Sequence, residues 1–153
     1  MKTLLNLFAV IGILLATCHS VEAQNVWRGG KPGQEKNWNT PGNWSKNRVP
    51  DIDDIVLIPN TESRGGFYPV ITEEVGPIYY LEVQGGATLS IAPQGSLTID
   101  GIGKYEDAIL LVGTIENRGE IRLSTAKHQL FAGHPENLLN EGKITSVFTP
   151  GNR

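Results

Sequence analysis

The chain has 153 residues, 39% of them hydrophobic, with a formal net charge of −3 and one cysteine. This length suits one domain of ordinary size. Lys and Arg do not cluster, which argues against a nucleic-acid surface. No glycine loop that could cradle a phosphate follows a strand pattern, so no cofactor is expected.

The first 23 residues are predicted to be a secretory signal peptide. Lys2 gives a basic start, Leu4–Leu15 is almost continuously apolar, and small residues surround Ala23. Cleavage after Ala23 predicts a secreted or outer-surface protein with no integral membrane segment, because the apolar run is too short to remain as a span. The alternative is a lipoprotein anchored through Cys18, since residues 15–18 loosely resemble a bacterial lipobox.

Residues 24–77 are predicted to form an irregular cap followed by a leading strand. Glycine, proline and asparagine are frequent between residues 25 and 50, and the first confident strand is expected at residues 54–59. Trp27, Trp38 and Trp44 lie close together in this stretch. They are expected to cover an apolar end of the fold, and the alternative is a ligand-binding platform on which sugar rings stack.

A group of three carboxylates precedes the first strand. Asp51, Asp53 and Asp54 offer the oxygen ligands that calcium prefers, which makes them weak metal candidates. No calcium-loop spacing accompanies them. We therefore expect a solvated turn at the strand entry and no metal site.

The remaining residues, 78–153, repeat at two lengths. Three apolar pairs follow one another every 8 residues, at Leu81/Val83, Leu89/Ile91 and Leu97/Ile99. The third pair then recurs 24 residues later at Ile121/Leu123, and Ile144 follows Ile121 after 23 more. Each pair is typical of a strand with alternate side chains facing inward.

This double period predicts an all-β protein: a short right-handed parallel β-helix with three strands per rung, its rungs in residues 78–153. Stacked rungs bury a continuous core that no single rung can bury alone. Asn117 and Asn140 occupy equivalent corners and are expected to stack through their amide groups. The alternative is an antiparallel β-sandwich, which explains the alternation but not the recurrence.

The cap and the first rungs together resemble a known sequence pattern. Trp27-x-Gly29, Trp38, Asn43-Trp44, Pro50 and Asp54-Ile55-Val56 resemble the N-terminal module of secreted bacterial surface or adhesin-like β-helix proteins. Autotransporter passenger regions and G8-like domains carry related patterns. Asn117-x-Gly119-x-Ile121 continues the resemblance.

The resemblance implies a non-catalytic structural or adhesin-like module and carries over no catalytic residue. The expected partners are a cell-surface or extracellular polysaccharide or a host surface protein. A carbohydrate-binding module that uses the three tryptophans is the alternative function. A polysaccharide-processing enzyme is the third hypothesis, and it is disfavoured because no paired acid and base share one face.

Overall fold

The computed structural model describes residues 24–101, 107–124 and 130–146. These residues form short strands and three one-turn 3-10 helices: η1 (Pro41–Asn43), η2 (Glu62–Arg64) and η3 (Pro135–Asn137). Within the described ranges, no helix is long and apolar enough to cross a membrane.

The strands are arranged in three sheets. Sheet one has the order β1 (Asn25–Val26), β2 (Ile55–Ile58), β5 (Tyr80–Val83), β8 (Ile109–Leu111), β11 (Phe131–Gly133). Sheet two has the order β3 (Val70–Ile71), β6 (Thr88–Ile91), β9 (Thr114–Asn117), β12 (Leu138–Asn140). Sheet three has the order β4 (Glu74–Ile78), β7 (Ser96–Ile99), β10 (Glu120–Leu123), β13 (Lys143–Ser146).

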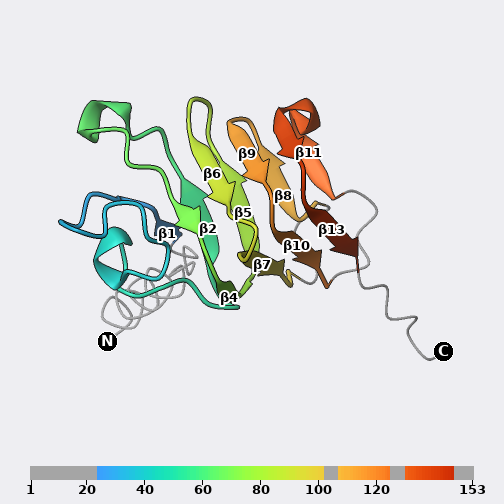
Figure 1. Cartoon of the computed structure of the whole chain (residues 1–153), viewed down its shortest axis with the longest axis horizontal. Helices are drawn as coiled ribbons and strands as arrows, with labels where there is room; N and C mark the ends of the chain where they lie inside the picture. The colour runs from blue at the N-terminus through green and yellow to red at the C-terminus, as the bar shows by residue number, and fades with distance from the viewer. Residues whose placement is uncertain (1–23, 102–106, 125–129, 147–153) are drawn as a thin grey trace, which may run out of the picture.

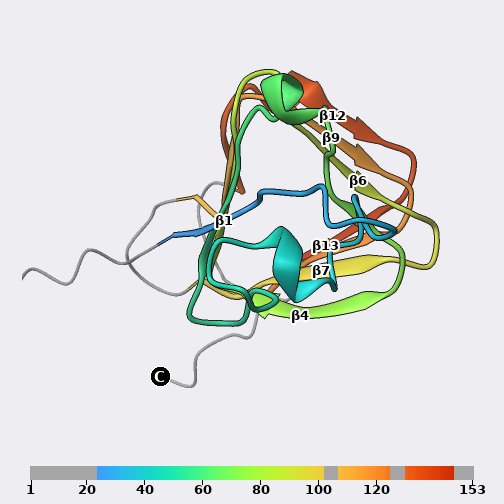
Figure 2. The same cartoon turned by 90° about the vertical axis from the view of Figure 1, so that its left-hand side faces the viewer.

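The chain visits the three sheets in rotation and so winds into a coil. Figure 1 shows the coil from the side, with its successive turns following one another from the N-terminal to the C-terminal end. Figure 2 looks along the coil and shows its triangular outline. Every pairing between the named strands is parallel. The predicted parallel β-helix is therefore confirmed, and the antiparallel β-sandwich is wrong.

The repeat seen in the sequence sets the register of the coil. Leu97 on β7 pairs with Ile121 on β10, and Ile121 pairs with Ile144 on β13. Leu81 and Leu89 lie on sheets one and two, and both are fully buried, as Leu97 is on sheet three. The 8-residue step thus moves the chain to the next face, and the 23–24-residue step moves it to the next turn.

The coil begins earlier than residue 78, where the sequence placed its first rung. Strands β2, β3 and β4 already form a complete turn that pairs with β5, β6 and β7. This turn lacks the clear period because β3 has only two residues and β4 changes register between Val75 and Ile78. Pro77 lies within this irregularity and has no backbone N–H to donate to a neighbouring strand.

A polar ladder ties the last two turns together at one corner. The Asn117 side chain is fully buried, and its Nδ2 donates to Asn140 Oδ1 at 2.7 Å and to the Lys143 carbonyl at 3.1 Å. Its Oδ1 accepts the Gly119 N–H at 3.1 Å. The predicted asparagine stack is thus confirmed. Gly119 is required beside it, because a Cβ there would lie 2.1 Å from the Gly95 carbonyl oxygen.

The two ends of the coil differ. At the N-terminal end, the segment before β2 crosses the triangular section and covers the core (Figure 2). At the other end, the inward residues Phe131, Leu138 and Ile144 are only partly buried, whereas the residues paired with them one turn earlier are fully buried. The apolar core is therefore closed at one end and more exposed at the other.

Candidate functional site

The three tryptophans form the inner surface of the cap. Trp27, Trp38 and Trp44 are 0%, 1% and 0% exposed and belong to the same apolar cluster as the first turns of the coil. The Trp44 ring packs edge-on against the other two, with centroid distances of 4.9 Å to Trp27 and 4.7 Å to Trp38. A sugar platform needs ring faces open to solvent, and these rings have none. The ligand-binding role expected as the alternative is therefore corrected to a cap role.

Residues beside the tryptophans hold the cap loops in place. The buried Asn43 accepts the Lys31 N–H at its Oδ1, and its Nδ2 donates to the carbonyls of Gln34 and Asn37. Gly29 has φ +64°, and a Cβ there would lie 2.6 Å from the Phe67 carbonyl oxygen. The Asn-Trp and Trp-x-Gly patterns are visible in the sequence, but the structural roles of Asn43 and Gly29 become clear only in the fold.

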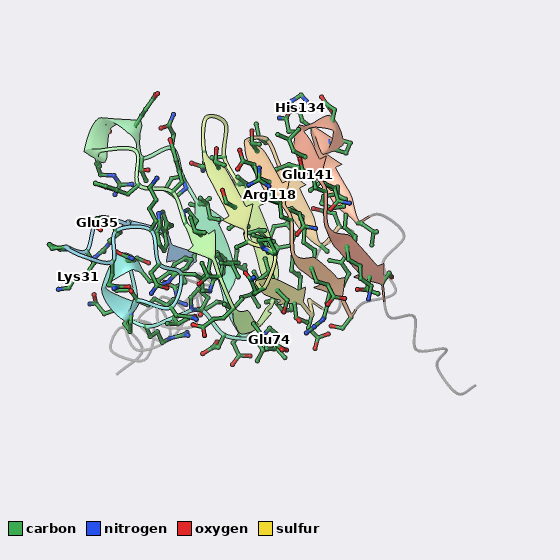
Figure 3. The ribbon with its side chains drawn as sticks, viewed as in Figure 1. Lys31, Glu35, Glu74, Arg118, His134 and Glu141 are labelled. Atoms are coloured by element: carbon green, nitrogen blue, oxygen red, sulfur yellow. The ribbon has the colours of Figure 1, made fainter. Side chains whose placement is uncertain are left out.

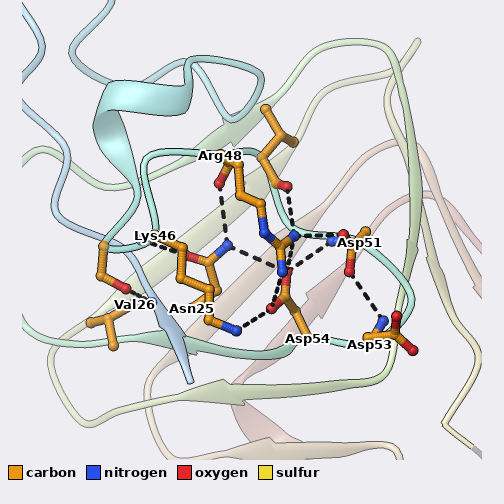
Figure 4. A network of polar contacts seen from close by, with 9 residues as sticks. Asn25, Val26, Lys46, Arg48, Asp51, Asp53 and Asp54 are labelled. Atoms are coloured by element: carbon orange, nitrogen blue, oxygen red, sulfur yellow. Dashed lines mark hydrogen bonds and ion pairs between the residues drawn. The ribbon is translucent and has the colours of Figure 1, made fainter. Parts of the chain in front are cut away.

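A network of ion pairs joins the cap to the first turn (Figure 4). The Asp54 carboxylate is fully buried and contacts Lys46 Nζ at 2.6 Å and Arg48 Nη1 at 2.7 Å. It also accepts the Asp51 N–H at 3.0 Å and a longer hydrogen bond from Asn25 Nδ2 at 3.4 Å. Burial raises the pKa of Asp54, but the hydrogen bonds from Lys46 and Asp51 and the nearby positive charges outweigh it and lower that pKa below its usual value.

The three aspartates considered as weak metal candidates all belong to this network. Asp54 is neutralised by two cations, and Asp51 contacts Arg48 Nη1 at 2.6 Å. Asp53 is exposed, and its backbone N–H donates to Asp51 Oδ1. A calcium ion at this position would face an arginine and a lysine. Among the described residues, no group of three metal-binding side chains is found. The expected solvated turn is wrong for Asp54, whose buried carboxylate pairs with Lys46 and Arg48 and anchors the cap to the coil.

A charged cluster covers the outer face of sheet three. Arg122 contacts Glu74 Oε1 at 2.9 Å and Glu120 Oε2 at 2.9 Å, and Lys143 Nζ lies 3.3 Å from Glu120 Oε1. The Thr145 hydroxyl and Arg122 donate to Glu120 and lower the pKa of its carboxyl to about 2. These charges, which come from β4, β10 and β13, bind one another across the sheet. Because its charged groups already pair with one another, the cluster has fewer groups available to bind a ligand than unpaired charges would have.

A shallow hollow of about 180 Å³ opens on the outer surface of sheet two. Residues from three successive turns line it: Val70, Ser90, Ile91, Ala92, Pro93, Glu116 and Arg118. The register places Ser90 on β6 between Val70 on β3 and Glu116 on β9. The hollow forms because Ser90 on β6 and Ala92, just after β6, have short side chains at this point, while longer side chains lie beside them.

The polar rim of this hollow is held by two contacts. The Ser90 hydroxyl donates to Glu116 Oε2 at 3.2 Å. Arg118 Nε donates to Glu141 Oε2 at 3.2 Å, and both of these side chains are mostly exposed, as Figure 3 shows on the outer surface of neighbouring turns. The hollow was not predicted from the sequence. It can be recognised only when the strand register places Val70, Ser90 and Glu116 side by side.

Comparison with known proteins gives a family without an assigned activity. No curated protein and no solved structure matches this chain. Residues 26–126 match the sequence profile of the family described as Domain of unknown function (DUF8693). The matched region contains the tryptophan cap, the Asp54 network and the hollow, and it ends just after β10. Because the match covers more than half of the chain, the protein belongs to the DUF8693 family.

Proposed function

We propose that the chain is a non-catalytic structural and adhesin-like module that works outside the cell or on the cell surface. One observation carries this proposal: the side chains that stood out in the sequence build the coil. The tryptophans, Asp54 and Asn117 are fully or almost fully buried and packed or bonded inside it. Among the described residues, the surface that remains for contact with other molecules is mainly the outer face of the three sheets.

The location part of the proposal rests on the sequence. Residues 1–23 have the pattern of a secretory signal peptide, and Cys18 is the alternative attachment point for a lipid. Both lie outside the described residues. A repetitive coil that holds its shape without disulfides is suited to an extracellular module that presents side chains at a fixed 4.7–4.9 Å strand spacing.

Localisation in a bacterial host tests the proposal. The full chain with a C-terminal tag is compared with a variant that lacks residues 2–23 and with Cys18→Ser. We expect the full chain in the medium or accessible to protease on intact cells, and the truncated variant inside the cell. Retention of all three inside the cell would contradict a surface role. Membrane association that Cys18→Ser abolishes would assign the lipoprotein alternative.

Incubation with polysaccharides tests the non-catalytic part. Purified protein is mixed with neutral and acidic polysaccharides, and the products are assayed for new reducing ends and unsaturated sugars. We expect neither product to form. Either product at a rate that follows protein concentration would contradict the proposal and establish an enzyme.

Carbohydrate binding is the second candidate function. The observation in its favour is the hollow on sheet two, since the tryptophans first considered for it are buried in the cap. This candidate assigns a carbohydrate ligand to the surface module.

A further inference from the structure

We infer that the hollow on sheet two binds one ring of a neutral oligosaccharide, as found in an extracellular polysaccharide. The inference rests on the proposed function, because it assumes a protein that meets such chains outside the cell. It is carried by the residues of the hollow, namely an apolar floor and two charged groups of opposite sign at its rim.

The backbone around the hollow leaves recognition to side chains. Strand β6 pairs with β3 on one side and with β9 on the other, and β9 pairs with β12. The N–H and C=O groups of these central strands are therefore used within the sheet. An extended peptide that adds itself as a strand has no free edge here. A ligand at this site must therefore be recognised by the side chains of the hollow and not by its backbone.

The floor of the hollow suits the C–H face of a sugar ring. Val70 lies partly buried on β3, and Ala92 and Pro93 follow β6 at the corner of the coil. These three side chains offer only carbon to a ligand, and such contacts exclude water from the apolar face of a ring. The volume of about 180 Å³ lies below the roughly 300–1,000 Å³ of pockets for drug-sized ligands. It suits a single ring rather than a large ligand.

The rim supplies one acceptor and one donor. Glu116 carries a carboxylate that only accepts hydrogen bonds, and Arg118 carries a guanidinium that only donates them. Within the described part of the chain, Arg118 uses Nε for Glu141, and Glu116 uses Oε2 for Ser90. Glu116 lies on β9, and Arg118 follows the last residue of that strand in the bend at the corner of the coil. Neighbouring hydroxyl groups of a sugar, which both donate and accept, match such a pair.

The charges at the rim favour a neutral sugar over an acidic one. Glu116 and Glu141 carry two negative charges beside the single positive charge of Arg118. Arg118 is already paired with Glu141. A uronate or sulfate group would meet a net negative charge, and the whole chain also has a net charge of −3.

A second apolar contact indicates how the sugar chain runs. Leu139 on β12 pairs with Glu116 and is 56% exposed on the outer surface. It lies one strand beyond Glu116, at the 4.7–4.9 Å strand spacing. A ring seated over Val70 and Ala92 can therefore continue toward Leu139. The oligosaccharide is then expected to cross the strands, roughly along the axis of the coil.

Affinity electrophoresis and calorimetry with soluble oligosaccharides test the inference. The full chain is titrated with neutral glucose, mannose and galactose oligomers and with an oligogalacturonate. Ala92→Phe fills the hollow, and Glu116→Gln removes the acceptor charge while keeping the side-chain size. Ala132→Phe and Glu82→Gln are the matched controls, because both positions point outward from sheet one. Unfolding curves verify that each variant keeps the wild-type fold.

We expect at least one neutral oligomer to bind, with little binding of the oligogalacturonate. Ala92→Phe and Glu116→Gln should then bind this oligomer at least tenfold more weakly than the wild type. The affinities of the two control variants should stay within twofold of the wild-type affinity. Failure of every neutral oligomer to bind, or unchanged affinity in folded Glu116→Gln and Ala92→Phe, would overturn the inference. Stronger binding of the oligogalacturonate would overturn its neutral specificity. A surface-located protein that binds no sugar would remove this inference and leave the proposed function standing.

Discussion

At the scale of single residues, Asp54 shows how a buried charge can hold an irregular segment to a regular one. Its carboxylate is fully buried, while Lys46 and Arg48 come from the loop that leads out of the cap. The same residue accepts the backbone N–H of Tyr79 at its carbonyl, which connects it to the next turn. Asp54 therefore links the cap, the first strand and the second turn.

Asp54→Asn is expected to destabilise the fold by about 2 kcal/mol at pH 7. Removing one partner of a fully buried pair costs about 3–5 kcal/mol, and we expect less here because Lys46 and Arg48 remain partly in water. Urea unfolding followed by circular dichroism measures the change. Asp53→Asn is the control, because the same substitution is made one residue away on an exposed side chain. Equal unfolding midpoints for the two variants would contradict the prediction.

The wild type and the Asp54→Asn variant also lead to a prediction of how stability depends on pH. The pKa of Asp54 is lowered in the folded protein, so its contribution is fully present above the unfolded-state pKa of about 3.9 and is lost as pH falls through the folded-state pKa. The stability difference between wild type and Asp54→Asn should therefore shrink below about pH 4. Urea unfolding at pH 7, 5 and 3 measures this difference. A difference that stays constant across this range would exclude the role assigned to the charge.

Two of the tryptophans offer a comparison of packing with hydrogen bonding. Trp44 Nε1 donates to the Trp38 carbonyl at 2.7 Å, whereas Trp38 Nε1 is buried and has no partner among the described residues. Replacement of either by Phe removes the same atoms from the core. We expect Trp44→Phe to destabilise the protein by about 1 kcal/mol more than Trp38→Phe. Denaturant unfolding of both variants tests this order, and the reverse order would contradict it.

At the scale of elements, the asparagine ladder joins successive turns. Asn117 lies between two turns with its amide fully bonded, whereas Asn140 lies on the last described turn and is exposed. We expect Asn117→Ala to destabilise the coil by about 2–3 kcal/mol because the Gly119 N–H and the Lys143 carbonyl lose their partner and the buried amide is removed. Asn140→Ala is expected to cost less than about 1 kcal/mol. Thermal unfolding compares them, and an effect of Asn117→Ala no larger than that of Asn140→Ala would contradict the prediction.

The sequence predicted the elements whose period is regular and missed those whose period is broken. Leu97, Ile121 and Ile144 repeat at nearly constant steps, so their register could be derived before the structure was known. The turn before residue 78 was missed because β3 is short and Pro77 interrupts β4. A period can be recognised only where several turns keep the same number of residues.

The candidate sites were harder to predict for a different reason. The partners of Asp54 come from an irregular loop, so no spacing rule connects Lys46 or Arg48 to it. The hollow depends on the relative length of side chains on three adjacent strands. Aromatic residues suggested a binding surface from the sequence, but their apolar area is used to close the core. Exposure, which decides between these roles, is a property of the folded chain.

At the scale of the whole molecule, the closed end and the more exposed end should contribute unequally to folding. In a coil each turn contacts only its neighbours, so stability is the sum of the turns and the interfaces between them. The cap adds three buried tryptophans and the Asp54 network to the first turn. The last turn, with half-buried Phe131, Leu138 and Ile144, adds less apolar burial.

Two truncations test this asymmetry. A chain that ends after residue 124 keeps the cap and three complete turns, and we expect it to fold cooperatively with a lower unfolding midpoint. A chain that lacks residues 24–50 exposes the first turn and leaves Asp54 buried without Lys46 and Arg48. We expect this second chain not to fold, because an unpaired buried charge and an open apolar core both disfavour the native state. Circular dichroism with urea unfolding distinguishes them. If the chain without the cap folds and the chain without the last turn does not, stability is carried by the C-terminal turns and the role assigned to the tryptophans is wrong.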